Sequence, residues 1–483
     1  MTKKMFMIVM AAALAATPAT PLVAQSPASS ISPQDKAQGA EAHPQLLREY
    51  GGAYDGPQAA YVRHVGQRIA VQSGLSNAQG DFTVTLLNSP VDNAFAIPGG
   101  YVYVTRDLLA LMNDEAELAS VMGHEVGHVA ARHARSRQNT ANIAGIGTGL
   151  LGALLGNSAL GQLVTKGVGY GAQLGVLGFS RGQETQADSL GVQYLVGAGY
   201  DPMAASTMLA SLAAQNALET RMGGVTAGTP TIFSTHPDPL GRVARTAQQA
   251  RATGVTTGAR NRDAFLAAID GMIYGDDPAQ GIVDGQTFRH PGLKIAFTVP
   301  SGFAVTNGTD SVTIAGQGGQ ATFSGGAYAG DLDAYIGKVL KALAPESSVN
   351  VPPARRFGAN GIDAASVTVG ASTASGPVDV TVVAYAVEPR AAYHFVLVAA
   401  QGSGTGPFRP MVDSFRRLTQ TEAAAIKPRR IKVVTVGRGD SVTTLASRMA
   451  YPTLQVERFR VLNGLAPDAV VRPGQKIKLV VIG

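Results

Sequence analysis

Two histidines and a glutamate in the stretch His124-Glu125-Val126-Gly127-His128 have the types and the spacing needed to bind a metal ion and use it. Successive helical residues are rotated by about 100°, so the two histidines would project roughly 40° apart on adjacent turns, with Glu125 about 60° from His128. Two neutral imidazoles can hold a zinc ion, and an adjacent glutamate can take a proton from water. The pattern therefore predicts a hydrolytic zinc site with Glu125 as its general base.

The helix that must carry this motif is predicted over residues 113–137. Asn113 or Asp114 can cap it, and Glu117 stands in the capping-box position relative to Asp114. Its apolar stripe is formed by Leu118, Val121, Met122, Val126 and Val129. The two histidines of the motif lie on the flank of this stripe, so we expect the site at the border between core and cleft.

Glu184 and Asp188 form a second candidate pair, in a helix predicted from Ser180 to Gly199. The two carboxylates are one turn apart, so they project from one face of that helix. This geometry suits a third metal ligand together with a carboxylate that orients a liganding histidine. Taken alone, such a pair is more often part of a solvated helix face.

Three other residues near these motifs need separate interpretations. His236 precedes Pro237, where a lone histidine is most often a turn residue, and Arg242 lies in a helix predicted just after it. His133 follows the metal motif, but on a continuous helix it would project about 180° from His124. We therefore do not expect His133 to be a ligand.

A β-hairpin is predicted directly before the metal helix. Strands are expected at residues 82–87 and 101–105, and Asn93, Ala94 and Phe95 begin an extended segment between them that ends in a Pro-Gly turn. Such a hairpin could offer an edge strand to an extended peptide. A hairpin that only packs on the core is an equally good interpretation.

The N-terminus has the features of a cleavable secretory signal. Lys3 and Lys4 precede an apolar run over residues 5–16 that is too short to span a bilayer, and Ala24 is a small residue at the expected cut. The chain has no cysteine, which excludes disulfides and lipid attachment through an N-terminal cysteine. We therefore predict export to the periplasm, with association with peptidoglycan or the outer membrane left open.

Residues 141–179 are rich in Gly, Ala and Leu, and the apolar run is long enough to raise the possibility of a membrane span. Glycine is dense, however, and Asn157, Ser158 and Gln162 interrupt the run. We favour a helical hairpin that covers the cleft over a membrane span.

The rest of the chain predicts two further units. A chain of 483 residues, with 45% hydrophobic residues, is too long for one ordinary core. After about residue 281 the pattern becomes strand-like, with helices at 332–343 and 408–418 and only isolated histidines, His290 and His394, which we interpret as structural. The last fifty residues follow the order strand, helix, helix, strand. A net charge of +6 in short basic runs without interleaved aromatic residues argues against nucleic acid as a partner.

The combination of motifs resembles the zinc metalloproteases of the HtpX, BepA and Oma-type peptidase family. The matching segments are His124 to His128 with Arg132-His133, Glu184 and Asp188 in QETQADSLG, Ser234-Thr235-His236-Pro237, and Asn93-Ala94-Phe95 with Pro98-Gly99-Gly100-Tyr101. The resemblance covers roughly residues 46–251. It is specific because four separated motifs occur in the family's order.

This resemblance implies a gluzincin-type site that holds one Zn2+ per chain. It makes His124, His128 and Glu184 the zinc ligands and Glu125 the general base, which leaves a fourth position for water. Asp188 is implied to support a liganding histidine. His236 and Arg242 are implied to lie near the site. One of them would stabilise the oxyanion, or His236 would occupy the open metal position in a resting state.

The C-terminal module resembles a LysM domain, which binds glycan chains built from N-acetylglucosamine. The resemblance rests on Gly439-Asp440-Ser441, Asn463-Gly464 and Pro473-Gly474-Gln475. It implies attachment to peptidoglycan, with a purely structural or protein-docking module as the alternative.

We therefore expect a multidomain α+β protein. Its parts are a signal peptide (1–24), a linker (25–45), a mainly helical zincin protease domain with a small β-sheet (46–270), an α+β domain of unknown role (280–420) and a βααβ LysM-like module (431–483).

The leading hypothesis is a secreted zinc endopeptidase that cleaves misfolded or misassembled envelope polypeptides. Nucleic acid is not expected as a partner, whereas association with a membrane surface is left open. The alternative is a peptidoglycan-associated chaperone or scaffold with a latent metal site.

Overall fold

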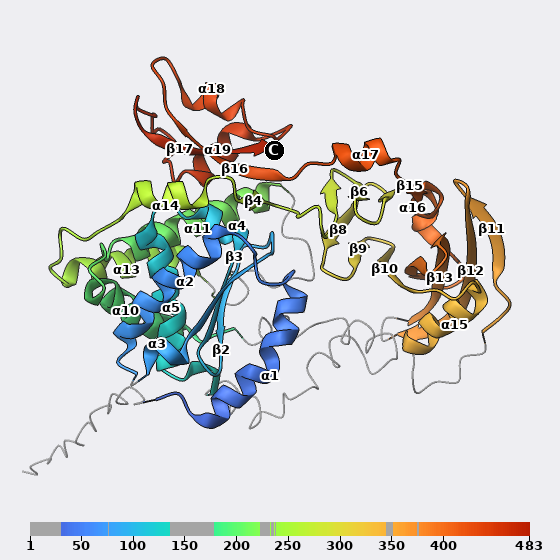
Figure 1. The fold of residues 1–483 in the computed structure, drawn as a ribbon, viewed down its shortest axis with the longest axis horizontal. Coiled ribbons are helices and arrows are strands. Elements are labelled where there is room, and N and C mark those ends of the chain that lie inside the picture. Colours follow the sequence, from blue (N-terminus) through green and yellow to red (C-terminus); the bar gives the residue numbers. More distant parts are fainter. Residues whose placement is uncertain are drawn as a thin grey trace, which may run out of the picture.

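The computed structural model describes residues 30–75, 77–135, 178–222, 232, 236, 238–343, 351–373 and 376–483. The predicted signal peptide and residues 141–177 lie outside this part of the chain. A mainly helical domain, a β-rich middle unit and a small C-terminal module follow one another in sequence (Figure 1). Within the described residues, no helix combines the length and the apolar character that crossing a bilayer requires.

Helix α5 (Glu115–Ala130) runs through the middle of the helical domain and is buried on nearly every side. Asp114 caps it by accepting a hydrogen bond from the Glu117 N–H, and the Glu117 carboxylate accepts one from the Asn113 N–H. These bonds satisfy amides at a helix start that would otherwise lack partners. The other helices of the domain include α2 (Pro57–Ala70), α3 (Ala78–Asp81), α4 (Arg106–Leu111), α10 (Arg181–Gly197), α11 (Ala204–Arg221), α13 (Pro239–Ala252) and α14 (Arg262–Ile269).

A three-stranded sheet packs beside α5 in the order β1-β3-β2. Its strands are β1 (Thr83–Leu87), β2 (Ala94–Ile97) and β3 (Tyr101–Thr105). β2 and β3 are antiparallel, with Ala94 opposite Val104, which confirms the predicted hairpin, while β1 runs parallel to β3. β2 is therefore an edge strand of this sheet.

The linker predicted over residues 25–45 is wrong from Pro33 onward, because helix α1 (Pro33–Glu49) begins there. Ser32 caps this helix by accepting a hydrogen bond from the Asp35 N–H, and proline suits its first turn. Leu46 of α1 packs in one buried cluster with Phe95 and Tyr103 of the sheet. Apolar contact with the sheet therefore orders a segment whose composition is typical of linkers.

The metal helix also ends earlier than predicted, at Ala130 instead of residue 137. Arg132 has a φ of 55°, a left-handed conformation that non-glycine residues rarely adopt. The chain therefore turns sharply after α5, and His133 does not continue the direction of the helix.

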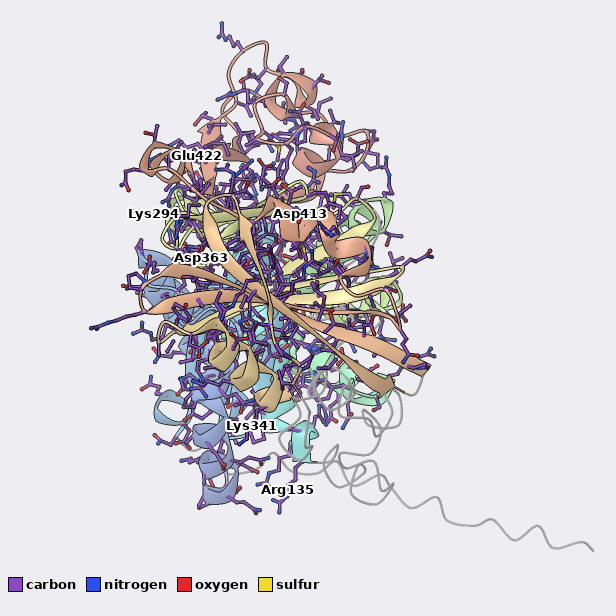
Figure 2. The ribbon with its side chains drawn as sticks, turned by 90° about the vertical axis from the view of Figure 1, so that its right-hand side faces the viewer. Arg135, Lys294, Lys341, Asp363, Asp413 and Glu422 are labelled. Carbon is purple, nitrogen blue, oxygen red and sulfur yellow. The ribbon has the colours of Figure 1, made fainter. Side chains whose placement is uncertain are left out.

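The middle unit consists of two antiparallel sheets and lies at the far side of the molecule from α5 (Figure 1). Figure 2 shows it from its outer side, with Lys341 on α15 and Asp363 on β12. The larger sheet has the order β11-β12-β13-β14-β10-β9-β8. Its strands are β8 (Phe303–Asn307), β9 (Val312–Gly316), β10 (Gly319–Ala327), β11 (Arg355–Ala359), β12 (Ile362–Thr373), β13 (Gly376–Glu388) and β14 (Ala391–Ala400). The smaller sheet contains β5 (Ile282–Asp284), β6 (Thr287–His290), β7 (Ile295–Thr298) and β15 (Arg416–Arg417), and the helices are α15 (Leu332–Leu343), α16 (Arg409–Ser414) and α17 (Gln420–Ala425).

The C-terminal module has the predicted strand, helix, helix, strand order. Its elements are β16 (Arg429–Thr435), α18 (Val442–Ala446), α19 (Gln455–Leu462) and β17 (Lys476–Ile482). The short strand β4 (Ile273–Tyr274) from the end of the helical domain joins this sheet, in the order β17-β16-β4. Buried side chains of the module, such as Phe459 and Leu479, belong to the same apolar cluster as those around α5.

Candidate metal centre

Helices α5 and α10 approach each other closely because glycines line their contact. A Cβ atom added to Gly123 would lie 3.2 Å from the Cα of Gly191, and one added to Gly127 would lie 3.3 Å from the Ala187 carbonyl oxygen. Both separations are tighter than ordinary side-chain contacts. Small residues therefore let the two helices pack backbone to backbone, which places Glu184 of α10 beside the histidines of α5.

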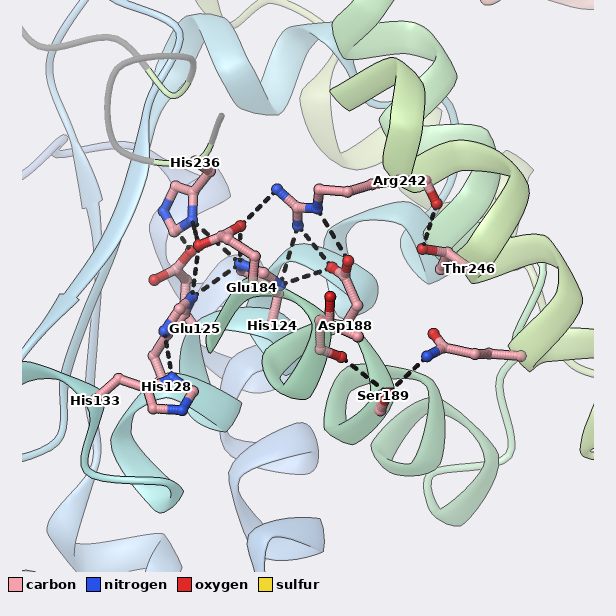
Figure 3. A network of polar contacts seen from close by, with 12 residues as sticks. His124, Glu125, His128, His133, Glu184, Asp188, Ser189, His236, Arg242 and Thr246 are labelled. Carbon is pink, nitrogen blue, oxygen red and sulfur yellow. Dashed lines mark hydrogen bonds and ion pairs between the residues drawn. The ribbon is translucent and has the colours of Figure 1, made fainter. Parts of the chain in front are cut away.

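The side chains of His124, His128, Glu184 and His236 converge on one point (Figure 3). The Nε2 atoms of His124 and His128 are 3.0 Å apart, and the Glu184 carboxylate lies 3.5 Å and 3.4 Å from them. Nδ1 of His236 lies 3.2 Å from His124 Nε2 and 3.0 Å from Glu184 Oε1. Corners of a tetrahedron whose centre is 2.1 Å away are about 3.4 Å apart, so this donor set fits zinc.

Glu125 is 1% exposed, and its carboxylate faces the same point. Its Oε1 atom lies 3.4 Å from Nε2 of His236, while Oε2 has no hydrogen-bond partner among the described residues. A buried carboxylate oxygen is expensive to leave without a partner. The unpaired oxygen therefore also fits a site that holds a cation and water.

Asp188 of α10 and Arg242 of α13 contact the residues of the ligand cluster. Oδ1 of Asp188 lies 3.1 Å from Nδ1 of His124, which leaves Nε2 of that ring directed at the ligand cluster. The Arg242 guanidinium donates to both oxygens of Asp188, at 2.9 Å and 2.6 Å, and lies 2.6 Å from Glu184 Oε2. This buried arginine bridges the two carboxylates of α10 and fixes their positions.

Burial and neighbouring charges shift the pKa values of the cluster in different directions. Burial would lower the pKa of His124, but the carboxylates of Glu184 and Asp188 outweigh it and raise this pKa to about 9. Burial lowers the pKa of His128 well below its usual range. Burial opposes ionisation of Glu184, but the neighbouring His236 and His124 hold its pKa well below the ordinary value. Glu184 is therefore ionised, as a metal ligand must be.

His133 lies against His128, which the helical extrapolation did not anticipate. The Nδ1 atoms of the two rings are 2.8 Å apart, and Nε2 of His133 is 3.1 Å from Oε1 of Gln186 on α10. Among the described residues, the possible ligands that converge do not include His133. Gln186, which no sequence pattern singled out, lies between Glu184 and Asp188 in the sequence.

A pocket opens beside His124, Glu125 and His236. Its wall opposite the charged groups is apolar and includes Val121, Met208, Leu209, Leu212 and Ile232. The candidate substrate-binding residues Asn93, Ala94 and Phe95 bury their side chains in the domain. Only their backbone, at the edge strand β2, could pair with an extended peptide.

Comparison with known proteins finds matches in two parts of the chain. Residues 57–250 match the profile of Peptidase family M48, and residues 434–480 match that of the LysM domain. The chain is 31% identical over 230 residues to the beta-barrel assembly-enhancing protease of Yersinia pestis, which covers 46% of each chain. The protein of that name from Escherichia coli is 31% identical over 43% of this chain and 42% of its own length. The mitochondrial metalloendopeptidase OMA1 of Schizosaccharomyces pombe is 32% identical over 43% of this chain and 59% of its own.

These matches confirm both resemblances read from the motifs, although the chain spans less than half the length of the two bacterial proteins just named. The matched region contains all the residues that converge at the metal centre. The chain thus carries a Peptidase family M48 domain at residues 57–250, which holds the candidate metal centre, and a LysM domain at residues 434–480.

Proposed function

We propose that this protein is an exported zinc-dependent endopeptidase of the bacterial cell envelope, which cleaves misfolded or misassembled envelope proteins and is held near peptidoglycan by its LysM domain. The convergence of His124, His128 and Glu184 beside the buried Glu125 carboxylate carries this proposal. Three protein ligands and an adjacent carboxylate are the requirements of a hydrolytic zinc site.

Each residue of the site has a distinct task in peptide hydrolysis. His124, His128 and Glu184 would hold the zinc ion, which when bound polarises a peptide carbonyl and acidifies water. Glu125 takes a proton from the attacking water and later delivers it to the leaving amine. Asp188 and Arg242 keep His124 and Glu184 in place through their buried bonds.

His236 closes the site in this structure, because its ring completes the donor set. A catalytic zinc site needs one position open to water, whereas a four-ligand site is typical of structural zinc. Hydrolysis therefore requires the ring of His236 to move away. The His236 N–H donates to the Ile232 carbonyl at 2.8 Å, and the Ile232 N–H donates at 2.9 Å to the carbonyl of Asp92, just before β2. An extended peptide beside β2 would compete with this closed arrangement.

The apolar cavity and the edge strand together suit an unfolded polypeptide substrate. Backbone pairing at β2 recognises any extended chain, and the cavity beside Glu125 accepts an apolar side chain. Folded proteins bury such side chains and present few extended segments, so both features favour misfolded chains. The names of the bacterial relatives are consistent with an envelope role.

The closed donor set also supports a second candidate function, a peptidoglycan-associated chaperone or scaffold with a latent metal site. The two functions differ in what happens when His236 is removed. We would purify the mature chain, measure bound zinc, and follow cleavage of unfolded casein by wild type, Glu125→Gln and His236→Ala.

The peptidase proposal predicts one zinc per chain in all three proteins. His236→Ala should cut faster than wild type, and Glu125→Gln should be slower than wild type by about 10²- to 10⁴-fold. If neither wild type nor His236→Ala cuts casein although both bind zinc, the scaffold is the better account. For the LysM domain, retention of the intact chain on purified peptidoglycan should be competed by N-acetylglucosamine oligomers. Retention that these oligomers do not affect would remove the glycan role.

A further inference from the structure

The two histidines of α5 are supported on their outward nitrogens by different chemistry. Nδ1 of His124 faces the Asp188 carboxylate, which Arg242 clamps. Nδ1 of His128 faces Nδ1 of His133 at 2.8 Å, and His133 in turn faces Gln186. His124 is therefore supported by a carboxylate and a guanidinium, whereas His128 is supported by an imidazole and an amide.

With neutral imidazoles, this chain of hydrogen bonds has one arrangement of protons that leaves a lone pair of His128 for the ligand cluster. If His128 presents the Nε2 lone pair to the ligand cluster, its proton lies on Nδ1 and is donated to His133. Nδ1 of His133 must then be the acceptor, so the His133 proton lies on Nε2. That N–H points at the Gln186 amide oxygen, 3.1 Å away, which is an acceptor. Each N–H in this chain of hydrogen bonds then faces an acceptor.

The surroundings shield this chain of hydrogen bonds from water. His133 is 4% exposed, and the ring of Phe179 stacks on His128 with 3.7 Å between centroids and an angle of 23°. The same phenylalanine lies 6.1 Å from the ring of His133. Water therefore cannot easily replace His133 as the acceptor for His128.

The backbone adopts an unfavourable conformation to place His133 there. Arg132 has a φ of 55°, and this turn after α5 brings His133 back beside the helix it has just left. A non-glycine residue in this region persists only where the surroundings hold it. The close contact of His133 with His128 and Gln186 provides such surroundings.

We propose that His133, held by Gln186, is a positioning residue for His128. It fixes the proton of His128 on Nδ1 and so keeps the Nε2 lone pair free for a metal ion. Supporting partners of this kind change metal affinity by about 10- to 100-fold. The inference rests on the proposed zinc site but concerns the tautomer of His128, which can be observed without metal.

The test compares near-isosteric variants in the full chain. The amide oxygen of His133→Asn stands where Nδ1 of His133 stands, so it can still accept from His128, whereas His133→Leu cannot. We expect His133→Leu to weaken Zn2+ binding by about 10- to 100-fold in chelator competition. His133→Asn should retain most of the affinity, and Gln186→Leu should lose only a few fold. Unfolding of the zinc-free variants in urea would control for packing.

The second measurement uses zinc-free protein with 15N-labelled histidine at pH 8. Long-range 1H–15N spectra report which ring nitrogen carries the proton, and we expect the Nδ1–H tautomer of His128 in wild type and His133→Asn but a mixture in His133→Leu. Equal zinc affinities in the asparagine and leucine variants, or the Nε2–H tautomer in wild type, would overturn the inference. If wild type binds no zinc, the proposed function fails, and the tautomer alone then decides whether His133 positions His128.

Discussion

The LysM domain and the middle unit both follow the peptidase domain, but only one of them shares its core. Phe459, Ile477 and Leu479 of the LysM domain are buried in one apolar cluster with residues of α5 and α2. The middle unit instead buries its own aromatic cluster, which includes Phe297, Phe323 and Phe395. The domain that is last in sequence is therefore the one built into the peptidase.

Lys478 is the most informative residue of the shared core. Its side chain is fully buried, and Nζ lies 2.7 Å from the carbonyl oxygen of Ala110, 3.3 Å from that of Leu111 and 2.5 Å from that of Met112. These carbonyls lie at the C-terminal end of α4, where no later turn of the helix supplies an N–H donor. A LysM side chain thus caps a helix of the peptidase domain.

The middle unit touches the peptidase domain through a few polar contacts, such as the Gly51 N–H with Thr309 Oγ1 at 3.1 Å. Its two ends lie side by side, because Tyr274 of β4 pairs with Arg429 of β16. It is therefore an insertion between two neighbouring strands. The comparison shows that chain order does not tell which units fold together.

The largest difference between the LysM domain and the middle unit should appear when each of them is deleted in turn. A chain that lacks residues 429–483 exposes the apolar side of α14 and leaves the end of α4 uncapped, so we expect no folded peptidase domain. A chain in which a short turn replaces residues 276–427 should still fold and bind zinc. Soluble yield, protease resistance and zinc content would check this. A stable, zinc-loaded peptidase without the LysM domain would contradict the shared core.

Lys478→Met should destabilise the joint peptidase and LysM unit by about 2–4 kcal/mol, because several buried carbonyls lose their donor. Lys476→Met is the matched control on the same strand. Lys476 makes a surface ion pair with Asp263 at 3.1 Å, so its loss should cost under about 1 kcal/mol. Calorimetry should show the middle unit melting unchanged in both variants. Equal losses of stability in the two variants would show that the buried amine of Lys478 contributes no more than the surface ion pair of Lys476.

The pH dependence of stability should separate the two units as well. Burial lowers the pKa of Lys478 to about 7, so between pH 7 and 10 the unfolded chain binds more protons at this residue than the folded one. Stability of the joint unit should therefore rise with pH, by up to about 1.4 kcal/mol per pH unit relative to Lys478→Met. Urea unfolding at pH 7, 8 and 9 measures the difference. Parallel pH profiles would mean that the amine stays charged in the folded state.

The smallest effect is expected from Tyr335→Phe in the middle unit. The Tyr335 hydroxyl donates to the Ala392 carbonyl at 2.9 Å and lies 2.9 Å from Nδ1 of His394. Its removal should cost the middle unit about 1 kcal/mol. Zinc affinity and the melting of the peptidase and LysM unit should not change. A change in zinc binding would reveal a coupling between the units that their contacts do not suggest.

The part of the site that follows from local geometry could be predicted from the sequence. His124, Glu125 and His128 share one helix, so their spacing alone places them together. Glu184 and Asp188 could be paired with each other by spacing, but their docking on α5 depends on glycine contacts between helices. The resemblance to a family supplied that step, and no helical periodicity would have done so.

The failures have equally physical causes. The position of His133 depends on the left-handed turn at Arg132, which no sequence pattern in this chain predicts. The sequence does not predict α1, because the linker-like composition of this segment outweighs the capping signal of Ser32 and Pro33. The role of Lys478 was invisible because a lysine in a strand is normally solvated, and its burial depends on another domain.

The shared core has a consequence for how such an enzyme would meet its substrates. If the LysM domain binds a glycan strand, the metal centre is held at a fixed distance from that strand and in a fixed orientation to it. The enzyme would then act at one place along the wall. Polypeptides would have to reach it, and the distance from the glycan to the cleft would decide which of them can be cut.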